Sequence, residues 1–171
     1  MSELSEFRIR KDISLREDHY SPLTGEQKHT FRGLNYYEER SDLRYITALE
    51  RYEHVEVVDL QTSSGSIASY LRWGKISFEV DGKEVDLTIF KDQQSDNLFL
   101  PFADATSGHE TYGAGRYLEV EPQSNGHLLV DFNYAYNPYC AYNDNWSCPL
   151  TPAENRLSVA IRAGERSFEE R

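Results

Sequence analysis

The chain has 171 residues, a length that fits one domain with a hydrophobic core of its own. Hydrophobic residues make up 39% of it and aromatic residues 13%, which excludes a chain that is disordered throughout. Acidic residues outnumber basic ones by 29 to 18, and the net charge of −11 disfavours binding to nucleic acid or to an anionic membrane surface.

The composition favours a cytoplasmic protein. No run of about 18 apolar residues predicts a membrane span, and the start of the chain lacks the basic and apolar regions of a secretory signal. Two cysteines are too few for a disulfide scaffold. Arg outnumbers Lys by 13 to 5, and an acidic, Lys-poor surface also suits a halophilic source.

The first element predicted along the chain is a helix. Residues 3–18 are dense in charge and contain neither Gly nor Pro. Their apolar positions are Leu4, Phe7, Ile9, Ile13 and Leu15. Ser21-Pro22 and Thr24-Gly25 then interrupt the pattern, so residues 1–30 are expected to form a helix and a connector. Residues 31–37 are expected to form a turn that leads into an extended segment.

From Arg44 onward the apolar residues alternate, which predicts strands. Ser63-Ser64-Gly65 is expected to form a hairpin turn, and Asp81-Gly82 is the strongest hairpin signal in the chain. The predicted strands cover residues 45–52, 55–62, 66–80, 84–90, 98–102, 116–120, 127–132 and 157–161. Thr151-Pro152-Ala153-Glu154 predicts a capping box with a short helical turn.

These elements predict a mainly β fold, a β-rich α+β domain that covers residues 1–171, with its β core at 44–171. About eight antiparallel strands in a meander must hide their edges, so we expect a barrel-like or sandwich sheet. The N-terminal helix is the one long helix expected.

Two segments, 102–117 and 131–155, break the alternation. Both are rich in side-chain donors and acceptors, and six aromatic residues fall between Phe132 and Trp146. Long irregular loops in a small domain are usually functional, and aromatic walls with a few polar groups are typical of ligand pockets. We therefore expect the two loops to pack against each other and to enclose a site for a small molecule.

In these loops the chain resembles a known family. The runs F-x-D-x-T-S-G-x-E-T-Y-G-x-G-R-Y-L, D-F-N-x-A-Y-N-P-x-C-A, C-P-L-x-P-x-x-N-R-L and I-x-A-G-E, between Phe102 and Glu165, are similar to the domain-of-unknown-function 1684 family of bacterial and archaeal proteins. The resemblance implies no settled activity, cofactor or substrate. The positions that it carries over are Asp104, Thr106, Gly108, Thr111, Tyr112, Gly115, Arg116, Tyr117, Asp131, Asn133, Tyr136, Asn137, Pro138, Cys140, Cys148, Pro149, Asn155 and Glu165.

The candidate site residues come from both loops. The expected ligand-binding side chains are Asp104, Thr106, Tyr112, Arg116, Asp131, Asn133, Tyr136 and Trp146. Asp104, Asp131 and Arg116 are also the catalytic candidates, because two close carboxylates can divide acid and base roles and a guanidinium can clamp a carboxylate or phosphate. Whether the domain is an enzyme or only a binding module stays open.

A structural explanation competes with this one. Asp104 and Asp131 can cap turns, Arg116 can pair with either carboxylate, and an aromatic cluster can be a second core under a long loop. The domain would then be a non-catalytic structural or interaction domain whose loops form a self-packed plug. For Arg116 the structural ion pair is the favoured interpretation.

Cys140 and Cys148 support a third alternative, a metal or redox site. Seven residues separate them, unlike the spacing of zinc ribbons, and only His109 and Asp131 could add ligands nearby. Two buried thiols beside an ordered loop are the preferred interpretation, a redox pair the second and a metal site the third.

Overall fold

Two antiparallel sheets form the body of the protein, which is described here for residues 1–168 of a computed structural model. The larger sheet has the order β2-β3-β4-β5-β6 and the smaller one the order β1-β8-β7. Within residues 1–168 the eight strands are β1 (Arg44–Ala48), β2 (Glu50–Gln61), β3 (Ile67–Val80), β4 (Lys83–Lys91), β5 (Leu98–Phe102), β6 (Arg116–Leu118), β7 (Glu121–Pro122) and β8 (His127–Asp131). The prediction of a mainly β, antiparallel fold is therefore confirmed.

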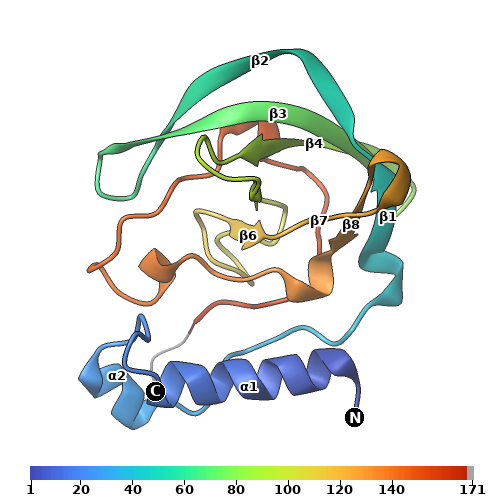
Figure 1. The fold of residues 1–171 in the computed structure, drawn as a ribbon. Coiled ribbons are helices and arrows are strands. Elements are labelled where there is room, and N and C mark those ends of the chain that lie inside the picture. Colours follow the sequence, from blue (N-terminus) through green and yellow to red (C-terminus); the bar gives the residue numbers. More distant parts are fainter. Residues whose placement is uncertain (169–171) are drawn as a thin grey trace.

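Both predicted hairpins are present. Gly65 at φ +85° lies in the turn between β2 and β3. Asp81 and Gly82 have φ of 50° and 80°, the two left-handed residues that the tight turn between β3 and β4 requires. The two hairpins make the long arch at the top of Figure 1.

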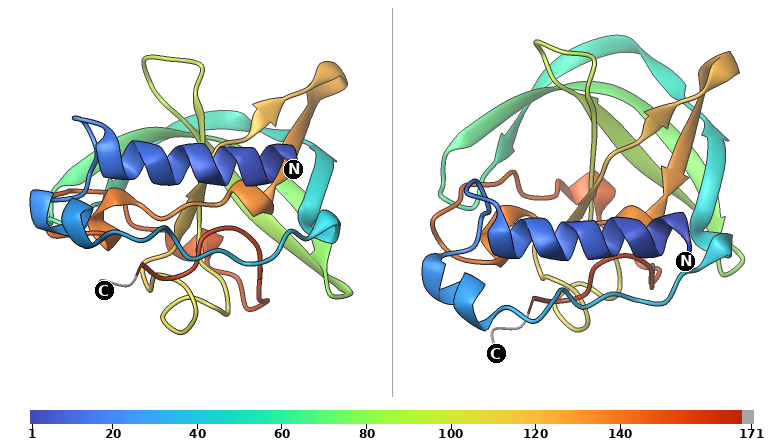
Figure 2. Two further views of the ribbon diagram at one scale, coloured as in Figure 1. Left: turned by 90° about the horizontal axis from the view of Figure 1, so that it is seen from below. Right: turned by 60° about the horizontal axis from the view of Figure 1, so that its bottom comes forward.

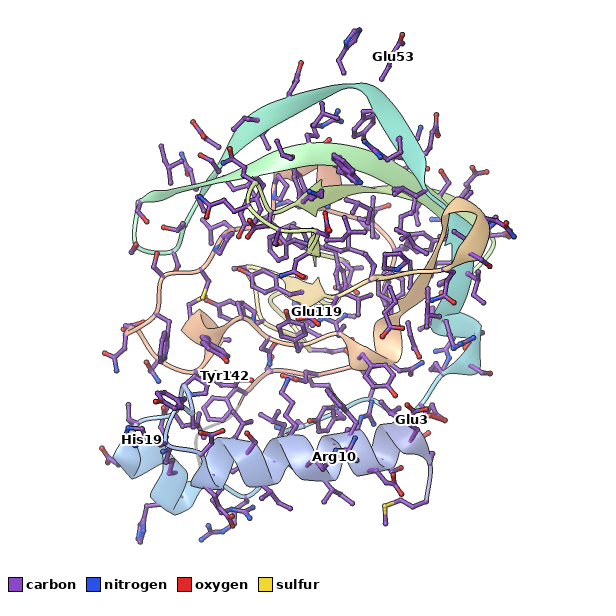
Figure 3. The ribbon with its side chains drawn as sticks, viewed as in Figure 1. Glu3, Arg10, His19, Glu53, Glu119 and Tyr142 are labelled. Carbon is purple, nitrogen blue, oxygen red and sulfur yellow. The ribbon has the colours of Figure 1, made fainter. Side chains whose placement is uncertain are left out.

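The two sheets face a common core but do not close into a barrel. β1 approaches β3 through side chains rather than a backbone ladder, because the hydroxyls of Tyr45 and Thr47 donate to the carbonyls of Glu79 (2.8 Å) and Ser77 (3.0 Å). Buried residues of both sheets pack together beneath this arch (Figure 3). The largest of them include Ile76, Phe78, Leu87, Ile89, Leu100, Phe102, Leu118, Val130 and Phe132.

The predicted N-terminal helix is α1 (Glu3–Glu17), and a second helix, α2 (Gly25–Thr30), lies in the connector. Ser2 caps α1, and Thr24 and Gln27 form a capping box on α2. α1 lies across the lower side of the molecule, against loop segments rather than against a sheet (Figures 1 and 2). It buries only Leu4 and Leu15 fully, so polar contacts contribute much of its docking.

The predicted strand at residues 157–161 is wrong. This segment has no partner strand, although Val159 and Ile161 are buried as the alternation suggests. Its backbone bonds to Ala103 and Ala105 through Leu157 (2.8 Å) and Val159 (2.9 Å) without forming a strand, and the side chains of Asp104 and Arg116 bind the backbone of Ile161. The structure has eight strands within residues 1–168 because it adds β7, which forms where a loop was expected.

The capping box predicted at Thr151 to Glu154 does not form. A short 3-10 turn, Ala153–Asn155, does occur there, but no side chain caps it. Thr151 donates to the carbonyl of Ala114 (3.1 Å), and the Glu154 carboxylate binds Arg72 (2.7 Å) and Thr88 (3.0 Å). Thr151 and Glu154 thus bind partners that are distant in the sequence, and the local cap does not form.

This arrangement of Glu154 predicts an acid-dependent loss of stability. Hydrogen bonds from Arg72 and Thr88 lower the pKa of Glu154 below its ordinary 4.5. A carboxyl with a lowered folded-state pKa stabilises the fold at neutral pH, and that contribution is lost as pH falls from about 4.5 through the lowered value. Between about pH 5 and pH 3 the wild type should therefore lose more free energy of unfolding than Glu154→Gln, as measured by urea titration.

The matched control is Glu53→Gln, because Glu53 is exposed and points away from the body (Figure 3). It should follow the wild type at every pH. Parallel pH profiles for wild type and Glu154→Gln would contradict the assignment.

Candidate functional site

Four polar side chains of segment 102–117 form a buried group, which we call the Arg116 cluster: Asp104, Thr106, Thr111 and Arg116. Arg116 begins β6 and is 1% exposed. Gly115 precedes it at φ +104°, and a Cβ there would lie 2.5 Å from the carbonyl oxygen of Phe102, so only glycine permits this close approach.

Asp104 is the acceptor at the centre of the Arg116 cluster. One carboxylate oxygen accepts the hydroxyl of Thr106 (2.7 Å), and the other accepts the backbone N–H of Ile161 (2.6 Å). The same oxygen lies 3.7 Å from Nη2 of Arg116, with both side chains at most 1% exposed. The structural ion pair predicted for Arg116 is therefore confirmed, with Asp104 as its partner.

The guanidinium of Arg116 also binds the C-terminal segment directly. It donates to the carbonyl oxygens of Ile161 (2.9 Å), Ala163 and Glu165 (3.1 Å). Burial lowers the pKa of Arg116, and the charge of Asp104 opposes that shift. The polar atoms of the cluster thus bind the chain itself, and the expected ligand-binding role of Asp104, Thr106 and Arg116 stays a prediction.

Asp131 and Asn133 lie apart from this cluster. Asp131 accepts the backbone N–H of Asn133 (3.1 Å), the turn-capping contact expected for it, and lies 3.8 Å from Nε of Arg44. The side-chain amide of Asn133 accepts the backbone N–H of Arg40 and donates to the carbonyl of Arg40, both at 2.8 Å. Within residues 1–168 no ion pair joins Asp131 to Arg116, because β6 and β8 belong to different sheets.

The two irregular loops do meet, as predicted, through contacts that include the predicted site residues Tyr112 and Tyr136. Tyr117 and Tyr136 form an isolated antiparallel bridge, with ring centroids 5.9 Å apart. The Tyr112 hydroxyl lies 3.5 Å from Sγ of Cys140. Trp146 donates to the carbonyl of Pro22 (2.9 Å), so it holds the connector rather than a pocket wall.

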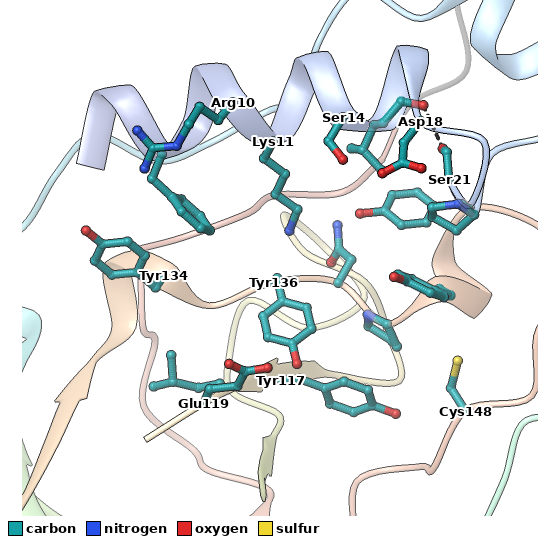
Figure 4. Close-up of a pocket in the computed structure, with 18 of the residues that line it drawn as sticks. Arg10, Lys11, Ser14, Asp18, Ser21, Tyr117, Glu119, Tyr134, Tyr136 and Cys148 are labelled. Atoms are coloured by element: carbon teal, nitrogen blue, oxygen red, sulfur yellow. Dashed lines mark hydrogen bonds between the residues drawn. The ribbon is translucent and has the colours of Figure 1, made fainter. Parts of the chain in front are cut away.

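A cleft of about 1140 Å³ opens between α1 and the segments that contain β6 and residues 134–149. Two of the predicted site residues, Tyr136 and Asp131, line it. Its aromatic lining is Phe7, Tyr20, Tyr117, Tyr134, Tyr136, Tyr139 and Tyr142, and its charged lining is Glu3, Arg10, Lys11, Asp18, Arg44, Glu119, Glu121 and Asp131. Figure 4 shows α1 along one wall, with Tyr117, Glu119 and Tyr136 on the other.

Lys11 reaches from α1 across the cleft (Figure 4). Its ammonium forms an ion pair with Glu165, whose side chain is 2% exposed, and lies 5.0 Å from the ring centroid of Tyr136. Glu165 also accepts the backbone N–H of Asn137 (3.1 Å). A buried carboxylate therefore fixes the lysine that connects both walls.

The tyrosines of the opposite wall remain neutral hydroxyl groups. Burial raises the pKa of Tyr136, with a further contribution from the charge of Glu119, and burial likewise raises the pKa of Tyr117. Asn137, another lining residue, is 1% exposed, and its Oδ1 has no hydrogen-bond partner among residues 1–168. The wall thus combines aromatic faces with an unsatisfied acceptor.

The cysteines are adjacent free thiols, since the backbone N–H of Cys140 lies 3.3 Å from Sγ of Cys148. Among residues 1–168 no group of three or more His, Cys, Asp or Glu side chains is placed to hold a metal ion. No helix in the same range is long and apolar enough to cross a membrane.

Lys11 and Glu119 are cleft residues that the sequence reasoning missed. Lys11 is one of several charges on a helix that looked solvated, and Glu119 alternates with core residues at the end of β6. Glu165 was noted only through the family resemblance. No local pattern in the sequence indicates that Lys11 pairs with Glu165 or that Glu119 lines the cleft.

The chain is similar to known proteins in both sequence and fold. A family model described as "Protein of unknown function (DUF1684)" matches residues 29–166. An uncharacterised protein of Haloarcula marismortui, known from a solution NMR structure, is 40% identical in sequence to this chain. That match covers 96% of this chain and 92% of the other, with a TM-score of 0.74. A halophilic source of that protein agrees with the acidic composition found here. The search of curated proteins found no match.

The Arg116 cluster generates a stability prediction. Arg116→Met leaves the carboxylate of Asp104 buried without its cation, which should lower the free energy of unfolding by about 3–5 kcal/mol in urea denaturation. Arg162→Met is the matched control, because Arg162 pairs with Glu110 at 3.0 Å but is 55% exposed. Its loss should be much smaller than that of Arg116→Met, because solvent screens an exposed ion pair.

The double variant Asp104→Asn with Arg116→Met should recover part of the loss, since it no longer buries an unpaired charge. A loss for Arg116→Met no larger than that of the Arg162 control would show that the ion pair does not stabilise the fold.

Proposed function

The chain belongs to the DUF1684 family of proteins of unknown function, and from the cleft beneath α1 we propose that it is a small-molecule-binding domain. The observation that carries the proposal is that this one cleft combines a large volume, an aromatic lining and polar groups that have no ion-pair or hydrogen-bond partner among residues 1–168. Ligand pockets are typically about 300–1,000 Å³, lined by aromatic side chains with a few polar groups. The cleft of about 1140 Å³ is of this kind.

The charges of the cleft favour a cationic ligand. Each basic lining residue already has a carboxylate nearby: Lys11 pairs with Glu165, Arg44 with Asp131 at 3.8 Å, and Arg10 with Glu6 at 4.0 Å. Within the described chain, Glu119 and Glu121 enter no ion pair. The net charge of −11 adds a long-range attraction for cations.

The aromatic faces favour the same class of ligand. A cation placed over a tyrosine ring gains about 0.5–2 kcal/mol, the larger value when water is excluded. Tyr136 already holds the Lys11 ammonium near its ring, so this surface accepts positive charge. The ligand class is therefore an organic cation with an apolar portion, such as an amine on a ring or short chain.

Binding rather than proton transfer is the proposed role of the tyrosines. Burial raises the pKa of Tyr117 and Tyr136, so neither phenol is a base at neutral pH. Of the three catalytic candidates only Asp131 lines the cleft, and a catalytic role for it stays a prediction. The proposal retains the expected cytoplasmic location, with no nucleic acid or membrane as partner.

A structural or interaction domain is the second candidate, favoured by the Arg116 cluster. Asp104 and Arg116 bind backbone groups of residues 161–165, as a self-packed plug would. Under this alternative the cleft has no specific ligand, and no small cation stabilises the protein.

Three matched probes distinguish these candidates: phenethylamine, phenethyl alcohol and hydrocinnamate, which share a phenyl group but are cationic, neutral and anionic. Phenethylamine should cause saturable amide shift changes around Lys11, Glu119 and Tyr136 in NMR titrations. Tyr136→Leu should weaken it roughly five- to tenfold, because a cation–π contact of about 1–1.4 kcal/mol is lost.

Tyr52→Leu is the matched control, because Tyr52 is equally half-buried but lies on β2, outside the cleft lining. It should bind phenethylamine as the wild type does. Equal shift changes with all three probes would indicate non-specific apolar contact, and no saturable change with any of them would favour the plug.

A further inference from the structure

Cys140 and Cys148 lie on either side of a short loop whose ends come together. The backbone N–H of Cys140 donates to Sγ of Cys148 at 3.3 Å. Because a backbone nitrogen is about 1.46 Å from its own Cα, the Cα of Cys140 is within about 4.8 Å of that sulfur. A Cα–Sγ approach this close allows the two backbones to reach the Cα–Cα range of about 4.4–6.8 Å that a disulfide requires.

The two thiols differ in accessibility. Cys140 is half-buried, whereas Cys148 is 8% exposed. Burial raises the pKa of the Cys148 thiol, and a hydrogen bond between the two cysteine side chains contributes to the same direction. The Tyr112 hydroxyl, 3.5 Å from Sγ of Cys140, can donate to that sulfur as it becomes a thiolate. Cys140 is therefore the thiol that reacts first.

We propose that Cys140 and Cys148 form a reversible dithiol–disulfide couple that exchanges with low-molecular-weight disulfides. The Cys140 thiolate attacks the external disulfide, so a mixed disulfide forms and one external thiolate leaves. Cys148, as the thiolate, then attacks Sγ of Cys140, which forms the internal disulfide and releases the second external thiolate. The protein loses two electrons and two protons, and the external disulfide becomes two thiols.

This modification site is independent of the cationic ligand proposed above, but it is placed to act on the cleft. The loop that the disulfide would close contributes Tyr142, Ser147 and Cys148 to the lining, and the lining residue Tyr139 directly precedes it. Closure would restrain this wall, whereas reduction leaves it held only by non-covalent contacts such as that of Tyr139 with Trp146, at 5.2 Å.

The full chain tests the proposal in buffers with a graded ratio of oxidised to reduced glutathione. After equilibration, free thiols are trapped with N-ethylmaleimide. The masses of peptides that contain residues 140–148 are then measured by mass spectrometry. Both thiols should be alkylated in the reduced buffers. As the ratio rises, both should disappear together in favour of a monomeric peptide that lacks two hydrogen atoms.

Two serine variants assign the order of attack. Cys148→Ser should stop at a glutathione adduct on Cys140, whereas in Cys140→Ser the buried Cys148 should remain largely alkylatable after denaturation. The oxidised wild type should melt roughly 4–12 °C higher than the reduced wild type, because the closed loop restrains the unfolded chain. Cys140→Ser, which can form neither the disulfide nor the adduct on residue 140, should melt at the same temperature in either buffer.

Three results would each overturn the proposal. Thiols that stay alkylatable at every ratio would show that no couple exists in this range. A stable glutathione adduct on wild-type Cys140 would show that Cys148 cannot reach it. A disulfide found only between two chains would show that the internal geometry is not used.

Discussion

The ion pair between Asp104 and Arg116 is the interaction on which the rest of the structure depends. Its two side chains are almost completely buried, and they hydrogen-bond backbone groups of a C-terminal segment that has no strand partner. A buried ion pair is tolerated only when further hydrogen bonds satisfy its remaining polar atoms. The hydrogen bonds to Ile161, Ala163 and Glu165 meet that requirement and hold residues 161–165 in place.

The same anchor determines the shape of the cleft. Arg116 holds the carbonyl of Glu165, and the carboxylate of Glu165 holds Lys11 on α1. The helix is thus positioned through a chain of three residues that begins in the core between the sheets. The plug explanation and the ligand explanation are therefore compatible, because a self-packed polar core provides the support for an aromatic cleft outside it.

The sequence predicted local features better than distant contacts. The Asp81-Gly82 turn, the charged helix and the strand alternation are encoded by neighbouring residues, and all appear in the structure. Residues 157–161 carry a strand pattern, but the side chains of Asp104 and Arg116, about 40 to 60 positions earlier, bind the backbone of Ile161 at its end. Of the ligand-binding residues expected from the sequence, only Tyr136 and Asp131 line the cleft. Its other wall comes from α1, whose charges give no sign of a partner.

The sparse docking of α1 has a consequence for motion. The helix buries two leucines fully, exposes Ile9 (48%) and Ile13 (44%), and otherwise depends on polar contacts such as that of Arg8 with the carbonyl of Tyr37. Segments with few buried apolar contacts open at a lower free energy than the core around them. We therefore expect α1, which forms one wall of the cleft, to open at a lower free energy than the two sheets, so that its opening would control access to the cleft.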